Sequence, residues 1–137
     1  MLGYWKESEA TARTVQDGWL HTGDLGYYDE RGFIYLVDRK KDMIVTGGEN
    51  VYPSEVETVL EEHEAVCESA VIGISDDKWG EAIKAVVILN ESFVPDEKLV
   101  QELIDFSRGK IAGYKLPKSI DFIKEEDMPR TATGKKL

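Results

Sequence analysis

The spacing of apolar residues predicts two β-hairpins in the first half of the chain. Residues 25–28 and 33–37 are rich in apolar side chains and flank a polar segment that ends in glycine, which suits a hairpin turn. A second and tighter hairpin is predicted over residues 43–51, with its turn at Gly47 and Gly48.

Two β-branched apolar runs, 70–74 and 82–89, predict paired central strands, and residues 119–124 predict a last short strand. Helical spacing begins at Pro53 and again near Pro95. The apolar positions that share a helix face are Val56, Val59, Leu60 and His63 in the first helix, and Leu99, Val100, Leu103 and Ile104 in the second. The order of elements predicts an α+β fold, a small mixed sheet with two helices on one face plus an N-terminal β-hairpin.

Tyr4, Trp5 and Trp19 have no periodic partner to pack against, so we expect the first 20 residues to be the edge of something larger. At 137 residues the chain is long enough for one compact domain. It is short for a complete enzyme that joins two substrates.

The charge balance is acidic, with 27 Asp and Glu against 17 Lys and Arg, which argues against nucleic acid or an anionic membrane as a partner. Cys67 is the only cysteine, which excludes an intramolecular disulfide and fits a reducing cytoplasm. No transmembrane segment and no signal peptide are predicted. His21 and His63 lack a carboxylate or nucleophile at motif spacing, so both are expected to be structural, and no metal site is predicted.

One stretch departs from this acidic balance. Between residues 108 and 118, here called the basic stretch, there is no Asp or Glu and there are four cations: Arg108, Lys110, Lys115 and Lys118. Tyr114 lies among them and can stack on a nucleobase. The stretch therefore predicts a local anion site.

Three motifs together carry a resemblance to a known family. They are residues 22–24 (TGD), 38–42 (DRKKD) and 129–135 (PRTATGK). In this order and spacing they resemble the C-terminal lid of the adenylate-forming superfamily, which includes acyl- and aryl-CoA synthetases, nonribosomal peptide adenylation domains and firefly luciferase. Residues 38–42 and 47–53 (GGENVYP) are most similar to the fatty-acyl and aryl-CoA synthetases.

The resemblance implies that Lys135 is the catalytic lysine of adenylation. Its ammonium would bridge the acyl carboxylate and the α-phosphate of ATP and stabilise the negative charge of the transition state. Gly134 would let the tail extend into a cleft. The alternative is a solvated, frayed terminus, and Lys136 is the neighbour that competes for the role.

The resemblance also implies nucleotide-binding and hinge residues. Asp24 would accept the ribose hydroxyls of ATP, and Arg39 would reach the ribose and a nearby phosphate. The alternatives are a turn aspartate and a surface cation. Lys41 would be the hinge about which the small domain rotates.

The resemblance also implies two groups of residues that contact coenzyme A (CoA), one at its pantetheine arm and one at its nucleotide. Gly47 and Gly48 would let backbone lie against the pantetheine arm, although a plain hairpin turn explains them equally well. Trp79 would line the thiol tunnel or would be a core or rim aromatic residue. Three residues would contact the CoA nucleotide: Tyr114, Lys115 and Lys118. Leu116 stands where relatives often have Arg.

The resulting hypothesis is a fragment of an acyl-CoA synthetase. Residues 1–38 would be the end of a large N-terminal domain with a linker hairpin, and residues 39–137 the lid. The partners would be a carboxylic acid, ATP, CoA and the missing large domain of the same polypeptide. Mg²⁺ is expected in the full enzyme but not in this fragment, which alone would be inactive. The alternative is a free-standing CoA-binding, nucleotide-binding or protein-interaction module without catalysis.

Overall fold

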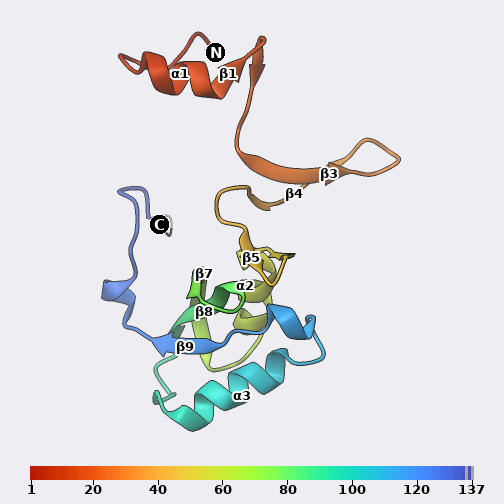
Figure 1. Ribbon diagram of the computed structural model, residues 1–137. Coiled ribbons are helices and arrows are strands. Elements are labelled where there is room, and N and C mark those ends of the chain that lie inside the picture. The colour runs from red at the N-terminus through yellow and green to blue at the C-terminus, as the bar shows by residue number, and fades with distance from the viewer. Residues whose placement is uncertain (135, 137) are drawn as a thin grey trace. The chain divides into compact units, whose positions relative to one another are not determined.

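The computed structural model describes residues 1–134 and residue 136. It divides the chain into two compact units, Met1–Lys41 and Asp42–Leu137, and Figure 1 traces both from red to blue.

The first unit consists of a short helix and two β-hairpins. Helix α1 (Ser8–Thr14) leads into the small pair β1 (Val15–Gln16) and β2 (Trp19–Leu20), and β3 (Asp24–Tyr28) then pairs antiparallel with β4 (Ile34–Arg39). This last hairpin confirms the predicted one. None of the residues of the unit is buried, so its aromatic side chains, Trp5 and Trp19 among them, lie exposed.

Asp29 fixes the turn between β3 and β4. Its carboxylate accepts hydrogen bonds from the amides of Phe33 and Arg31, at 3.0 and 2.9 Å, and from the Tyr35 hydroxyl at 3.2 Å. These bonds favour the ionised form, and the bond from the Phe33 amide contributes most to holding the pKa of Asp29 below its ordinary value. Beside the turn, the rings of Tyr27 and Tyr35 stack at a centroid distance of 5.0 Å.

The second unit contains a five-stranded mixed sheet. Its strands are β5 (Ile44–Thr46), β6 (Glu49–Val51), β7 (Val66–Asp76), β8 (Gly80–Leu89) and β9 (Ser119–Phe122). The order is β6-β5-β8-β7, and β9 runs parallel to β8 while the other pairs are antiparallel. The predicted second hairpin, the central pair and the last strand are all present.

Two helices cover one face of this sheet, as predicted. Helix α2 (Pro53–Glu61) begins with proline at its first turn, and α3 (Glu97–Ser107) is capped by Asp96, whose carboxylate accepts from the Leu99 amide at 2.6 Å. Alternate residues of β8, Ile83, Ala85 and Val87, point to the same face of the sheet. They form one core with Val56 and Leu60 of α2 and with Leu99 and Leu103 of α3. The α+β fold class is confirmed.

Two short 3₁₀ turns, Gly113–Lys115 and Glu125–Asp127, flank β9. Within the described residues, no helix has both the length and the apolar character needed to cross a membrane.

Candidate functional site

In the first unit, strand pairing brings Asp24 and Arg39 together. They are Cα partners across β3 and β4, and Arg39 Nε lies 3.5 Å from Asp24 Oδ1. The hairpin extends past this pair, because the Lys40 amide donates to the Gly23 carbonyl at 2.8 Å. Both side chains are partly exposed. A carboxylate beside a guanidinium offers acceptors and donors at one place, which suits a hydroxyl-bearing ligand.

In the second unit, the structure brings Gly47 and Trp79 into contact. The Gly47 amide donates to the Trp79 carbonyl at 2.9 Å, and a Cβ added to Gly47 would lie 2.9 Å from the indole ring atom Cε3. Gly47 and Gly48 have φ of +60° and +86°, so the turn uses the left-handed region that favours glycine. We call these two residues the glycine turn.

The indole of Trp79 lies at the rim of the unit and is 45% exposed. Its position is set by Asp76, whose Oδ1 accepts from the amides of Lys78 and Trp79 at 2.9 and 2.8 Å. The Lys78 ammonium lies 4.7 Å from the ring centroid. The backbone of Gly47 therefore lies directly against a half-exposed indole.

The basic stretch is less free of acid than its sequence indicates. Lys115 Nζ contacts both carboxylate oxygens of Glu55 at 2.7 Å, and its side chain is only 18% exposed. Lys110 pairs with Glu62 at 2.7 Å.

Arg108 pairs with Asp105 at 3.4 Å, so three of the four cations have carboxylate partners. Within the part of the chain that the structure describes, Lys118 has no ion pair, and its side chain is exposed. Its backbone is fixed, since the Lys118 amide donates to the Ile83 carbonyl at 2.8 Å. Tyr114, on the 3₁₀ turn Gly113–Lys115, is 43% exposed.

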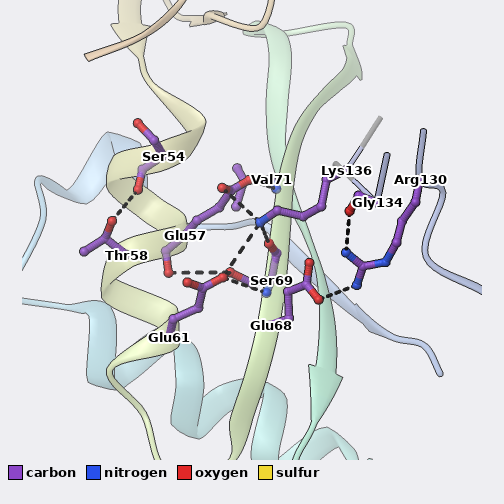
Figure 2. Close-up of polar contacts among 10 residues, drawn as sticks. All are labelled: Ser54, Glu57, Thr58, Glu61, Glu68, Ser69, Val71, Arg130, Gly134 and Lys136. Carbon is purple, nitrogen blue, oxygen red and sulfur yellow. Dashed lines mark hydrogen bonds and ion pairs between the residues drawn. The ribbon is translucent and has the colours of Figure 1, made fainter. Parts of the chain in front are cut away.

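The C-terminal segment is fastened to β7 by Arg130 (Figure 2). Its guanidinium donates to Glu68 and, at 3.3 Å, to the Gly134 carbonyl. The bond to Glu68 is the main reason that the pKa of Arg130 is raised above its ordinary value. Arg130 therefore stays charged at any working pH.

Lys136 makes a second attachment, drawn at the centre of Figure 2. Its ammonium donates to the Ser69 carbonyl and lies 3.4 Å from Glu57 and 3.8 Å from Glu61. The same two carboxylates accept from the edge of β7, Glu61 from the Ser69 amide and Glu57 from the Val71 amide, each at 2.9 Å. Lys136 is thus committed to the α2 and β7 surface. Lys135, the predicted catalytic residue, lies outside the described residues.

Residues 55–135, more than half of the chain, match the family described as the AMP-binding enzyme C-terminal domain. The chain belongs to this family. It is thereby the C-terminal domain of the adenylate-forming superfamily that the motifs indicated, and the relatives below bear names from its CoA-ligase branch.

Two curated relatives match almost the whole chain. A long-chain-fatty-acid–CoA ligase of Bacillus subtilis (strain 168) is 50% identical over 137 residues, which are 100% of this chain and 24% of the ligase. A 2-succinylbenzoate–CoA ligase of Bacillus cereus (strain ATCC 14579) is 47% identical over 135 residues, 98% of this chain and 27% of that protein. The chain thus spans about a quarter of the length of the curated relatives it matches.

A solved structure has the same fold. The o-succinylbenzoate CoA synthetase of Bacillus subtilis, in complex with the acyl-adenylate intermediate OSB-AMP, is 41% identical with a TM-score of 0.87. The match covers 98% of this chain and 26% of that one.

Among the residues that the structure describes, no group of three or more His, Cys, Asp or Glu side chains is placed to hold a metal ion such as Mg²⁺.

Sequence reasoning missed one residue beside the glycine turn. The Glu81 carboxylate accepts from the Val45 amide at 2.7 Å, across 36 positions of sequence. A glutamate at the start of a strand has no local signal for such a bond. It also missed the use of Glu57 and Glu61, whose spacing of four residues did place them on one side of the helix.

Proposed function

We propose that the chain is the C-terminal domain of an AMP-forming acyl-CoA synthetase. The observation that carries this proposal is the match of nearly the whole chain to two CoA ligases at about half identity. In the first step a substrate carboxylate attacks the α-phosphate of ATP and releases pyrophosphate. In the second step the CoA sulfur attacks the acyl carbonyl of the adenylate, the thiol proton is lost, and AMP leaves.

For the first step we assign the charge stabilisation to Lys135, because a compact ammonium acts strongly on two anions that approach each other. Asp24 and Arg39 would hold the ribose of ATP. Their contact at 3.5 Å and their partial exposure support this, since a diol could bond to both without a rearrangement of the hairpin.

For the second step we assign the glycine turn and Trp79 to the pantetheine arm, because the turn offers bare backbone beside an exposed indole. Tyr114 and Lys118 would meet the CoA nucleotide, the first by stacking and the second by charge. We propose a different role for Lys115, because both carboxylate oxygens of Glu55 contact its ammonium group. It would serve CoA mainly by holding the Gly113–Lys115 turn against α2.

The domain assignment follows the same logic. We propose Lys41 as the hinge, and the division between the two compact units after Lys41 supports it. Residues 1–38 would complete a large domain that carries the phosphate loop, the acyl pocket and most of the adenine site. Without those parts we expect the chain to be inactive by itself.

Lys135→Ala in the full-length enzyme tests the proposal. Adenylation, measured by pyrophosphate exchange, is expected to fall on the order of 100- to 1000-fold, because a contact specific to the transition state is lost. Thioesterification of supplied acyl-adenylate should survive. Lys124→Ala is the control, since the pair of Lys124 with Glu126 is exposed and lies at 3.5 Å.

Lys136→Ala separates the two neighbouring lysines. It removes an attachment to Glu57 and Glu61, and we expect a smaller loss of adenylation than for Lys135→Ala. The reverse order would transfer the assignment to Lys136. A full-length enzyme that forms neither acyl-adenylate nor acyl-CoA from any carboxylic acid would overturn the proposed function.

A further inference from the structure

The hairpin that carries the glycine turn has little strand pairing with the rest of the sheet. Strand β6 lies at the outer edge, and β5 meets β8 at one pair of Cα partners, Thr46 and Gly80. Ile44 and Val51 anchor the base of the hairpin in the core, whereas Gly47 and Gly48 at its tip lie beyond this single pair. Other contacts must therefore set where the turn lies relative to Trp79.

Glu81 provides such a contact through its side chain. Its Oε2 accepts from the Val45 amide at 2.7 Å, and a hydrogen bond to an ionised acceptor is stronger than one between neutral groups. Three successive residues of the hairpin are thus linked to three successive residues around the start of β8. Val45 bonds to Glu81, Thr46 pairs with Gly80, and the Gly47 amide donates to the Trp79 carbonyl.

The fold keeps a space for this carboxylate. A Cβ added to Gly73 on β7 would lie 2.7 Å from Glu81 Oε1 and 3.2 Å from Ile44 Cγ2. A side chain at position 73 would therefore displace the Glu81 carboxylate from the place where it reaches Val45. The backbone at Gly73 is ordinary strand, so the space for Glu81 is the structural reason for this glycine.

We infer that Glu81 is a positioning residue for the thioesterification step. By holding the Val45 amide it fixes the glycine turn at its close approach to the Trp79 indole, and so fixes the surface along which the pantetheine arm would pass. This inference rests on the proposed function. Glu81 itself touches no substrate in this scheme and acts through the backbone of the turn.

Three variants of the full-length enzyme test it. Glu81→Ala removes the acceptor, and Glu81→Gln keeps an oxygen of the same reach. Gly73→Ala retains Glu81 but displaces its carboxylate, because the end of a flexible side chain moves more easily than backbone. Glu91→Ala, which removes an exposed carboxylate elsewhere in the unit, is the control for charge.

We expect Glu81→Ala and Gly73→Ala to raise the KM for CoA in thioesterification of supplied acyl-adenylate by about 10-fold. Glu81→Gln should stay within about 3-fold of wild type, because a neutral acceptor keeps roughly half the strength of such a bond. Pyrophosphate exchange should be unchanged in all three. Hydrogen exchange measured by mass spectrometry should be faster in peptides that cover residues 43–48 for Glu81→Ala and Gly73→Ala, but not for Glu81→Gln.

Two results would overturn the inference while the ligase function stands. One is faster exchange at residues 43–48 with an unchanged KM for CoA, which would make Glu81 a purely structural residue. The other is unchanged exchange in Glu81→Ala, which would mean that the bond to Val45 does not hold the turn. A wild-type enzyme that forms no acyl-CoA would instead refute the proposed function, and with it the step that Glu81 is inferred to support.

Discussion

Different forces hold the two parts of the second unit that carry groups suited to CoA. The glycine turn is held by the bond from the Gly47 amide to the Trp79 carbonyl, by the bond from the Val45 amide to Glu81, and by the close approach of Gly47 to the Trp79 ring. In the basic stretch, three cations are held by carboxylates, among them Lys115 by Glu55. Packing and backbone bonds respond little to salt, whereas the more exposed ion pairs, those of Arg108 and Lys110, weaken as salt is raised.

The difference shows that a cation with no acidic residue beside it within the stretch can still be paired in the fold, and is then not free to bind a ligand. The glycine turn is already formed and needs no partner to be displaced. A phosphate that binds to the basic stretch must either compete with a protein carboxylate or use Lys118. At Gly47 and Gly48 the turn should therefore respond to steric changes, whereas the basic stretch should respond to changes of charge.

The largest effect is expected when Gly47 and Gly48 are each changed to alanine. Both sites have positive φ, which costs an L-residue about 1–2 kcal/mol. Gly47→Ala also drives a Cβ to 2.9 Å from the indole, and such overpacking costs roughly 1–3 kcal/mol more. Urea denaturation of the chain measures both free energies of unfolding.

Gly48→Ala is the matched control, because no atom lies within 4 Å of a Cβ at that site. Equal losses of stability at the two positions would show that the contact between the glycine turn and Trp79 has no energetic weight.

An effect smaller than that at the glycine turn is expected when Lys115 and Lys118 are each changed to glutamine. Loss of the Lys115 and Glu55 pair should lower the free energy of unfolding by about 0.5–1 kcal/mol, and a double-mutant cycle with Glu55→Gln isolates the coupling. Lys118→Gln should leave stability within about 0.5 kcal/mol of wild type, because its side chain is exposed.

CoA affinity should show the opposite order. Lys118→Gln should weaken binding a few-fold, on the order of 1 kcal/mol for one phosphate contact, and the loss should shrink as salt is raised. Calorimetric titration of the full-length enzyme with CoA measures it. A greater loss of affinity in Lys115→Gln would show that Glu55 gives up its partner to the ligand.

The smallest effect concerns Asp29, a carboxylate that holds a turn in the first unit much as Glu81 does in the second. Because the pKa of Asp29 is lowered, its stabilisation of the turn is present above its ordinary pKa and is lost as the pH falls through the lowered value. The amide signals of Arg31 and Phe33 should then shift in an acid titration followed by NMR. In Asp29→Asn these shifts should vanish, and their persistence would mean that another group titrates there.

Most of the fold could be predicted from the sequence, because hairpin turns and helix starts have local signals. Pro53 and the spacing of apolar residues in α2 and α3 indicated both helices. Strand β7 was predicted to begin at residue 70 and begins at Val66. The register shift between Val66 and Glu68 inserts Cys67, which breaks the alternation that marks a strand.

The site was less predictable, because its contacts join residues far apart in sequence. Gly47 and Trp79 were each identified, but their contact depends on the single pairing of β5 with β8. The partners of Lys110 and Lys115 lie 48 and 60 positions away, so the basic stretch looked unpaired. Glu81 has no distinguishing neighbours in sequence, and only the geometry of Val45 and Gly73 identifies its bond.

The attachment of the C-terminal segment bears on how copies of this domain stay apart. Strand β7 ends the sheet, and an uncovered strand edge pairs readily with another chain. Here Glu57 and Glu61 occupy the amides of Val71 and Ser69, and Lys136 occupies the Ser69 carbonyl (Figure 2). A polypeptide shortened before Arg130 would uncover that carbonyl. We expect such a truncation to favour self-association through β7.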